Sequence, residues 1–295
     1  MPFRNFLSPR PGKRAAACGA LTVAAATLLA SGALAPASAA AATTSAPAAG
    51  PADFPASVGA HGEARVTAAV LDLDLPGRTP TVFGEETPYD TASIIKVDIL
   101  AALLLKAQDS GRALTDGERA QTKAMIEHSD NAAANALWRS IGLAPGLKAA
   151  NKRLGLTETV GGPGGKWGLT RTTSADQIRL LRAVFDTGQT TKPGSAPALD
   201  AASRAYIRSL MSNVADDQSW GVSAAGGAGT ALKNGWLQRD TTDLWDVNSV
   251  GRITAGGHHY LVAVLSDGNK TMKDGVSLVE RAARTAVSTA AAGGS

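Results

Sequence analysis

The stretch Ser93-Ile94-Ile95-Lys96 stands at the head of an apolar run that continues to Leu105. This run predicts a buried helix. Residues three apart lie on one face of a helix, so the Lys96 amine is expected to reach the Ser93 hydroxyl. A desolvated lysine with a lowered pKa can accept a serine proton, which predicts a nucleophile and its base. Taken alone, Ser93 could instead be a helix N-cap and Lys96 a surface lysine.

Two later stretches complete a pattern with this one. Ser129-Asp130-Asn131 follows the apolar run, and Lys233-Asn234-Gly235 lies within a strand-like stretch. The order S-x-x-K, S-D-N, K-[T/S]-G is the signature of the serine β-lactamases and penicillin-binding proteins. The chain resembles that superfamily, and most closely a class A β-lactamase-like serine hydrolase. The resemblance extends from about Val66 to the C-terminal helix.

The resemblance implies a role for each residue of the first two motifs. Ser93 would be the nucleophile that forms an acyl-enzyme, and Lys96 the general base or a proton relay. Ser129 would pass a proton to the leaving nitrogen. Asp130 would hold the loop, and Asn131 would hydrogen-bond a substrate amide. Serine, aspartate and asparagine are also the common N-caps, so an ordinary helix start is an alternative that can hold at the same time.

The third motif is expected to face the substrate. By resemblance, Lys233 would attract a substrate carboxylate, and Gly235 would leave room for substrate along the strand edge. The backbone N–H groups of Ser93 and Trp236 would form the oxyanion hole. Asn234 departs from the usual Thr or Ser, although its amide can still donate to a carboxylate. Trp236 either stacks on substrate or belongs to the core.

A second departure concerns water activation. Class A enzymes carry a Glu in an E-x-x-L-N pattern between the second and third motifs, and that Glu activates the deacylating water. Residues 156–170 lack this pattern and form a glycine-rich loop whose only acid is Glu158. Glu158 is a candidate for a catalytic role, with an exposed loop carboxylate as the alternative. The sequence therefore predicts slow deacylation, another deacylation route or a non-lactam substrate.

The N-terminus has the features of a secretory signal. Residues 1–39 combine a basic start, an apolar Ala-rich segment and the cleavage pattern Ala37-Ser38-Ala39. The only cysteine, Cys18, lies in this segment, so no disulfide is expected in the secreted chain. The segment also carries four basic and no acidic residues, so the formal charge of +4 falls to zero without it. Basicity therefore gives no reason to expect nucleic-acid binding.

The remaining chain predicts an α+β fold. Residues 40–62 are rich in Ala and Pro and are expected to be a flexible leader. Residues 63–291 are expected to form the catalytic domain. Strand patterns at both ends of this domain predict an antiparallel sheet flanked by terminal helices, made by residues 63–92 and 216–291. Helical patterns between them predict an inserted all-helical lobe over 93–215.

These inferences lead to a secreted serine hydrolase acylated at Ser93. β-Lactam hydrolysis is the first choice by resemblance. A D,D-peptidase or esterase acting on cell-wall-like peptides, and a binding or sensing module that acylates without turnover, are the alternatives. No cofactor is expected and no metal-ligand spacing is found; His258 and His259 are adjacent, which favours a turn over a metal site. A monomer without a stable membrane anchor is expected.

Overall fold

The computed structural model describes residues 53–75, 79–186 and 197–293. The expected signal segment and residues 40–52 of the expected leader lie outside these described residues. Within them, no helix has both the length and the apolar character needed to cross a membrane.

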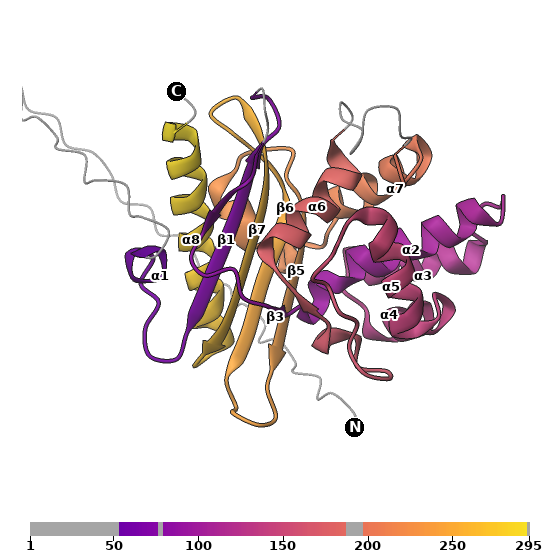
Figure 1. The fold of residues 1–295 in the computed structure, drawn as a ribbon, viewed down its shortest axis with the longest axis horizontal. Helices are drawn as coiled ribbons and strands as arrows, with labels where there is room; N and C mark the ends of the chain where they lie inside the picture. Colours follow the sequence, from indigo (N-terminus) through magenta and orange to yellow (C-terminus); the bar gives the residue numbers. More distant parts are fainter. Residues whose placement is uncertain (1–52, 76–78, 187–196, 294–295) are drawn as a thin grey trace, which may run out of the picture. The chain divides into compact units, whose positions relative to one another are not determined.

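A five-stranded antiparallel sheet forms the centre of the molecule (Figure 1). Its strand order is β2-β1-β7-β6-β5, so the first and last long strands of the domain are neighbours. Val66 pairs with Ser266 and Asp72 with Tyr260 along this central contact. Strands from the two ends of the domain therefore pair in the sheet, as the strand patterns predict. The strands are β1 (Arg65–Asp72), β2 (Thr81–Phe83), β5 (Ala231–Gln238), β6 (Trp245–Ala255) and β7 (His258–Asn269).

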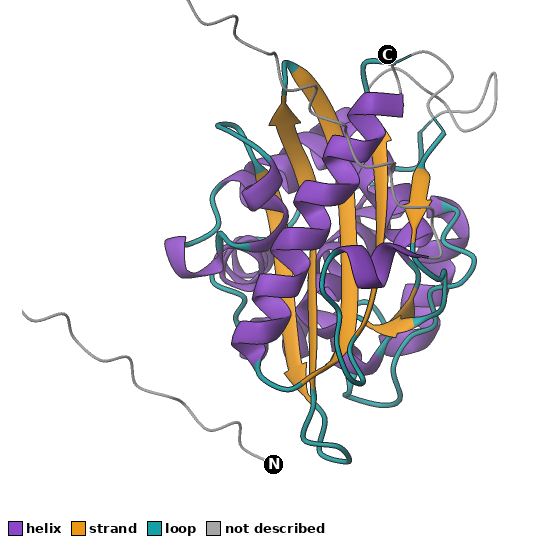
Figure 2. Cartoon of the chain, turned by 90° about the vertical axis from the view of Figure 1, so that its left-hand side faces the viewer, coloured by secondary structure: helices purple, strands orange, loops and turns teal. Residues whose placement is uncertain are grey.

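One face of the sheet is covered by the C-terminal helix α8 (Met272–Gly293), which crosses the strands in Figure 2. Val262 and Val264 of β7 point to this side and pack with Leu278 and Val279 of α8. The short helix α1 (Phe54–Ser57) joins the same core, and the Phe54 ring lies 5.3 Å from that of Phe83.

The domain therefore begins earlier than the boundary expected at residue 63. Phe54 and Val58 are buried in the core beneath the sheet, so the leader ends before Phe54. The Ala/Pro-rich composition of this segment gave no sign of the boundary. Only two large apolar residues, Phe54 and Val58, attach the short helix to the core.

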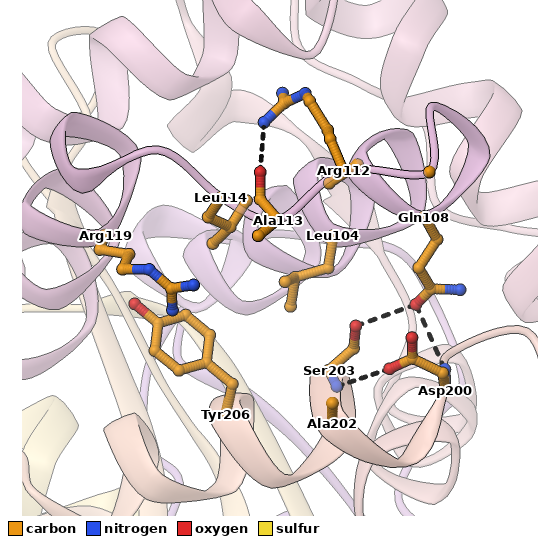
Figure 3. A pocket seen from close by; sticks show the side chains of 12 residues that line it. Leu104, Gln108, Arg112, Ala113, Leu114, Arg119, Asp200, Ala202, Ser203 and Tyr206 are labelled. Atoms are coloured by element: carbon orange, nitrogen blue, oxygen red, sulfur yellow. Dashed lines mark hydrogen bonds between the residues drawn. The ribbon is translucent and has the colours of Figure 1, made fainter.

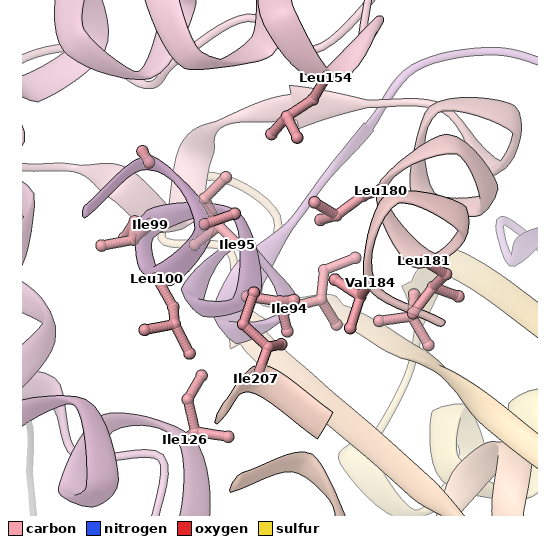
Figure 4. Packing of buried hydrophobic residues seen from close by; sticks show 14 of the residues in the cluster. Ile94, Ile95, Ile99, Leu100, Ile126, Leu154, Leu180, Leu181, Val184 and Ile207 are labelled. Atoms are coloured by element: carbon pink, nitrogen blue, oxygen red, sulfur yellow. The ribbon is translucent and has the colours of Figure 1, made fainter. Parts of the chain in front are cut away.

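The other face of the sheet carries the helical lobe, whose central element is α2 (Ile95–Asp109). Apolar side chains from several elements pack around α2, with Ile126, Leu154, Leu181 and Ile207 among them (Figure 4). A helix that is apolar all round is stable only when neighbours enclose it. The enclosing helices are α3 (Asp116–Glu127), α4 (Asn131–Ser140), α5 (Leu143–Leu154), α6 (Ser174–Phe185) and α7 (Ala201–Ser212).

Short elements join the two layers. The strands β3 (Tyr89–Asp90) and β4 (Arg171–Thr172) pair with each other beside the start of α2. Four 3-10 turns complete the described fold: η2 (Ala92–Ile94), η3 (Trp167–Leu169), η4 (Asp216–Gln218) and η5 (Gly221–Ala225). The predicted α+β class, with terminal helices on a sheet and an inserted helical lobe, is confirmed.

Candidate active site

Ser93 lies in η2, one turn ahead of the helix that the sequence predicts to contain it. The preceding residue, Ala92, has a φ of 46°, a left-handed conformation that costs free energy for a residue with a side chain. The segment is held from the sheet by Asn248, whose Nδ2 donates to the backbone oxygens of Asp90 and Thr91 at 2.9 and 3.1 Å. A rigid sheet thus fixes the strained turn that carries the candidate nucleophile.

Lys96 follows in the first turn of α2 and is fully buried. Its Nζ donates to the Ser129 backbone oxygen at 2.6 Å and to Asn131 Oδ1 at 2.8 Å, and it lies 3.1 Å from Ser129 Oγ. Burial, assisted by the nearby charge of Lys233, lowers the pKa of Lys96 to about 6. Lys96 can therefore be an unprotonated amine at neutral pH, which is the state that accepts a proton.

The S-D-N stretch forms the junction between α3 and α4. Ser129 has a φ of 54°, and its backbone oxygen and hydroxyl both meet the Lys96 amine. Asp130 caps α4, because its carboxylate accepts from the Ala133 N–H at 2.6 Å. The helix-start interpretation and the active-site interpretation thus apply to the same three residues.

Lys233 reaches this junction from the sheet. It is 1% exposed, and its Nζ donates to Ser129 Oγ at 2.9 Å and to the Asn234 backbone oxygen at 2.8 Å. Burial lowers the pKa of Lys233 to about 7. The Ser129 hydroxyl therefore bridges two buried amines, and it can accept a proton from one side while it gives one up on the other.

Gly235 explains how the strand and the nucleophile come together. A Cβ on Gly235 would lie 2.5 Å from the Ser93 backbone nitrogen and 2.8 Å from that of Ile94. The missing side chain therefore makes room for the backbone of η2 itself, where the sequence led us to expect room for substrate. The expected oxyanion pair, Ser93 and Trp236, comes from these two adjoining elements.

Comparison with known families assigns the chain to one of them. The model of the Beta-lactamase enzyme family matches residues 118–290, which is more than half of the chain. The chain belongs to this β-lactamase family. A comparison with curated protein sequences finds no match.

Solved structures of β-lactamases and of a penicillin-binding protein share the fold of this β-lactamase-family chain. TLA-3 extended-spectrum β-lactamase is 16% identical, with a TM-score of 0.66 over 82% of this chain and 99% of its own. A class A β-lactamase from Bacteroides cellulosilyticus DSM 14838 is 16% identical, with a TM-score of 0.65 over 81% and 96%. PBP-A is 19% identical, with a TM-score of 0.64 over 82% and 96%. At these identities the likeness shows the fold.

Asn234 does not face Ser93 in this β-lactamase-family chain. Successive strand residues alternate between faces, so Lys233 and Gly235 point to the helical lobe while Asn234 and Trp236 point to the opposite side. The Asn234 amide is buried and donates to the backbone oxygens of Gln218 and Trp220, both at 2.8 Å. Its donors are thus occupied, and the structure gives no support to the expected hydrogen bond with a substrate carboxylate.

The Trp236 indole lies on this opposite face, beside Trp220. The two rings are 5.9 Å apart at 54°. Both pack at the border of the core under α8 and remain half-buried. The core interpretation of Trp236 accounts for its side chain, and the expected contribution of its backbone N–H to an oxyanion hole stays a prediction.

Glu158 is exposed and its backbone N–H binds Asp176 Oδ2 at 2.8 Å, near the start of α6. Among the described residues, no hydrogen bond or ion pair links its carboxylate to Lys96, Ser129 or Lys233. The structure thus favours the exposed loop carboxylate over a catalytic role.

Trp167 lies beside Lys96, although no role in the site was expected for it from the sequence. The Lys96 amine lies over its ring, 4.8 Å from the ring centroid. The indole Nε1–H donates to Asn135 Oδ1 on α4 at 2.8 Å, which fixes the ring. The loop between the second and third motifs therefore meets the candidate base with an aromatic face. The single tryptophan in this glycine-rich loop was the available sequence signal.

A separate cavity of about 690 Å³ lies between α2, α3 and α7 (Figure 3). Leu104, Gln108 and Tyr206 are among the residues that line it. Gln108 Oε1 accepts hydrogen bonds from the Ser203 hydroxyl and from the Asp200 backbone N–H. Leu104 is eleven residues along the chain from Ser93, which corresponds to roughly 16 Å of helix. This cavity is thus apart from the candidate active site.

Proposed function

We propose that this protein is a serine hydrolase that is acylated at Ser93, with a β-lactam as the first-choice substrate. The observation that carries the proposal is the buried Lys96 amine beside Ser129, with a pKa lowered to about 6. A structural lysine would be expected to keep its charge and pair with a carboxylate. The Lys96 contacts instead lead to Ser129 and, through Ser129, to Lys233.

The acylation step follows from these contacts. The neutral Lys96 amine takes the Ser93 proton as Ser93 Oγ bonds to the lactam carbonyl carbon. The lactam C–N bond then breaks, and its nitrogen takes a proton from the Ser129 hydroxyl. Lys96, now an ammonium, returns a proton to Ser129 across their 3.1 Å contact. Lys96 is directed to Ser129 and Asn131 in this structure, so a rotation of the Ser93 hydroxyl toward the amine precedes the first transfer.

Deacylation is proposed to be slow. A water molecule needs a base to attack the acyl ester, and a carboxylate side chain could be that base. The loop instead places Trp167 beside Lys96. Glu158 is exposed and bound through its backbone to Asp176. The acyl-enzyme is therefore expected to accumulate.

Intact-mass measurement with benzylpenicillin tests this proposal, alongside nitrocefin turnover. The native chain should gain the mass of one penicillin and keep it for minutes or longer, while Ser93→Ala should gain none. Fast nitrocefin turnover would contradict slow deacylation, and Glu158→Gln would then show whether Glu158 is the missing base. No adduct and no turnover would remove β-lactams from the candidate substrates.

The second candidate is a D,D-peptidase or esterase activity on cell-wall-like peptides. The placement of Asn234 favours a neutral ester within this candidate, because carboxylate recognition is left to Lys233 alone among the third-motif side chains. Faster turnover of a D-Ala-D-Ala peptide or a thioester than of nitrocefin would establish this candidate. Stoichiometric acylation without release by any of these substrates would instead indicate a non-turnover acyl-binding or sensing module.

We further propose that the chain acts as a secreted monomer after removal of residues 1–39. The basic and apolar character of that segment supports export. N-terminal sequencing of the exported protein would locate the cleavage, and light scattering would give its mass in solution.

A further inference from the structure

Four polar residues gather at one end of the sheet, away from Ser93. Asp72 and Asp74 lie at the end of β1, and His258 and His259 begin β7. Gly235, which contacts the Ser93 backbone, pairs with Asn248, Asn248 pairs with Leu265, and Leu265 pairs with Thr67. Thr67 is therefore the residue of β1 that lies level with the candidate active site. Asp72 is five residues further along that strand, which places the cluster roughly 16 Å away along the strand direction.

The donor atoms of three of these residues converge. One ligand atom from each of Asp72, Asp74 and His258 lies within 4.8 Å of the other two. His258 Nδ1 is 2.8 Å from Asp72 Oδ2. Two ligands of one tetrahedral Zn²⁺ ion at about 2.0–2.2 Å are themselves roughly 3.3–3.6 Å apart, so an increase of less than about 1 Å in this separation would turn the hydrogen-bonded pair into a coordinated one.

The backbone holds these donors in place before any ion binds. Asp72 pairs with Tyr260 across the sheet, and the Leu73 N–H donates to the His259 oxygen at 2.8 Å. The Asp74 backbone N–H donates to Asp72 Oδ1 at 2.8 Å, which fixes the Asp72 carboxylate against the Asp74 backbone. Such support lowers the cost of ordering the ligands.

The side chains are oriented by neighbours as well. The His258 ring stacks on buried Tyr260, with 6.1 Å between centroids and 22° between planes. His259 Nδ1 lies 3.0 Å from Asp74 Oδ2, so it supports Asp74 from outside the converging set. Metal-bound carboxylates and imidazoles commonly have outer partners of this kind.

An open space adjoins the cluster. Asp72 and His258 also line a cavity of about 650 Å³ that extends to Arg284 on α8. Water can enter such a space and complete the coordination of an ion bound at its edge. The two carboxylates supply the negative charge that a divalent cation requires, and the imidazole nitrogen favours a transition metal over Ca²⁺ or Mg²⁺.

We propose that Asp72, Asp74 and His258 bind one divalent transition-metal ion, with Zn²⁺ as the best-fitting ion, and that this ion links the end of β1 to the start of β7. The site is independent of the acylation proposed at Ser93. Asp72 and Asp74 are close in sequence but His258 is far from both, so the three donors form no local metal motif. Without a metal, the same residues form His–Asp pairs.

Zinc titration of the full chain tests the proposal, after treatment with EDTA and removal of the chelator. Calorimetry should show one Zn²⁺ per chain, and Co²⁺ should give a visible absorption band typical of a protein site. Asp74→Asn and His258→Gln should each lose saturable binding of both ions. His259→Gln should keep the stoichiometry and weaken binding about tenfold, as expected for an outer partner.

His61→Gln is the matched control, because His61 is exposed and precedes the opposite end of β1. It should bind Zn²⁺ as the native chain does. Circular dichroism of each metal-free variant shows whether it is folded, so that lost binding is not mistaken for lost structure. Absence of saturable Zn²⁺ binding in the native chain would overturn the proposal. Equal affinity in folded Asp74→Asn and His258→Gln would do so as well.

Discussion

The Lys96 amine lies over the indole ring of Trp167, 4.8 Å from its centroid. The ring is fixed by its hydrogen bond to Asn135 and covers the amine on the side of the loop. Lys96 thus has an aromatic face and hydrogen-bond acceptors around it, in a buried site that lowers its pKa to about 6. A base of this kind can be neutral at pH 7 and can then accept a proton.

Lys96→Arg separates the proton-accepting role of Lys96 from its positive charge. An arginine can still lie against Trp167, but its guanidinium keeps its proton at any pH of interest. We expect the acylation rate by benzylpenicillin to fall by at least 10²-fold, the lower end of the usual contribution of a general base. Stopped-flow or timed intact-mass measurements would give the rate. Retention of more than a tenth of native acylation in folded Lys96→Arg would show that another group takes the Ser93 proton.

The pH dependence of acylation should differ between anionic and neutral substrates. Acylation should rise as pH increases through about 6, because Lys96 then loses its proton. Lys233 loses its charge as pH increases through about 7, so recognition of a substrate carboxylate should decline above that pH. For a penicillin, a plot of the acylation rate constant divided by KM against pH should therefore be bell-shaped. For a neutral ester, the same plot should rise through about pH 6 and then stay level. An alkaline limb of equal size for both substrates would remove carboxylate recognition by Lys233.

Asn234→Ala tests the assignment of Asn234 to structure. The change leaves the buried backbone oxygens of Gln218 and Trp220 without their donor. We expect the free energy of unfolding to fall by about 1–3 kcal/mol, the usual cost of leaving a buried polar group unpaired. Urea unfolding measures this loss, while acylation by penicillin should stay within twofold. A tenfold loss of acylation at unchanged stability would return Asn234 to the substrate site.

The sequence was sufficient to predict that residues of the three motifs lie together, because the order of the motifs and the hydrophobic pattern of their elements are both local features of the chain. Lys96, Ser129 and Lys233 meet through direct hydrogen bonds. The period of two along β5 also contained the information that Asn234 faces away from Lys233, although a resemblance to Thr-containing motifs led to another expectation. A strand assignment should therefore limit which motif residues can share a face.

Other features depend on tertiary contacts that no local pattern encodes. Trp167 comes from a glycine-rich loop without periodicity, and its position is set by Asn135 on a different element. Asn248 supports the turn before Ser93 from a strand far away in sequence. The start of the domain at Phe54 rests on contact with Phe83 across the core. Each of these requires the assembled fold.

Gly235→Ala should disrupt the site without an added charge. The new Cβ would lie 2.5 Å from the Ser93 nitrogen, a contact that only backbone movement can relieve. Because small displacements of a reacting group can cost 10²-fold in rate, we expect acylation to fall by about that factor. Gly227→Ala is the matched control, since the nearest neighbour of its Cβ would be 3.8 Å away. Comparable acylation by folded Gly235→Ala and by the control would contradict a steric requirement at Gly235.

The burial of Asp98 should make the stability of the folded protein depend on pH, separately from catalysis. Asp98 is completely buried two residues after Lys96, and the Asn151 side chain is the polar neighbour of its carboxyl group. Burial raises the pKa of Asp98 to about 8, against a smaller opposing influence of Asn151. The folded state thus holds a proton that the unfolded state releases near pH 4. The stabilisation is complete below about pH 4 and is lost progressively as pH rises from there to about 8, the folded pKa.

Asp98→Asn removes this titration and keeps the shape of the side chain. Relative to the variant, the native chain should lose about 1 kcal/mol of unfolding free energy for each pH unit between pH 5 and 8. Urea unfolding of both proteins at pH 5, 6, 7 and 8 gives the difference, in which the other titrating groups cancel. Asp109→Asn controls for the loss of a carboxylate, because Asp109 lies on the same helix with its side chain 59% exposed. A stability difference between the native chain and Asp98→Asn that is constant over this range would show that Asp98 is ionised in the folded protein.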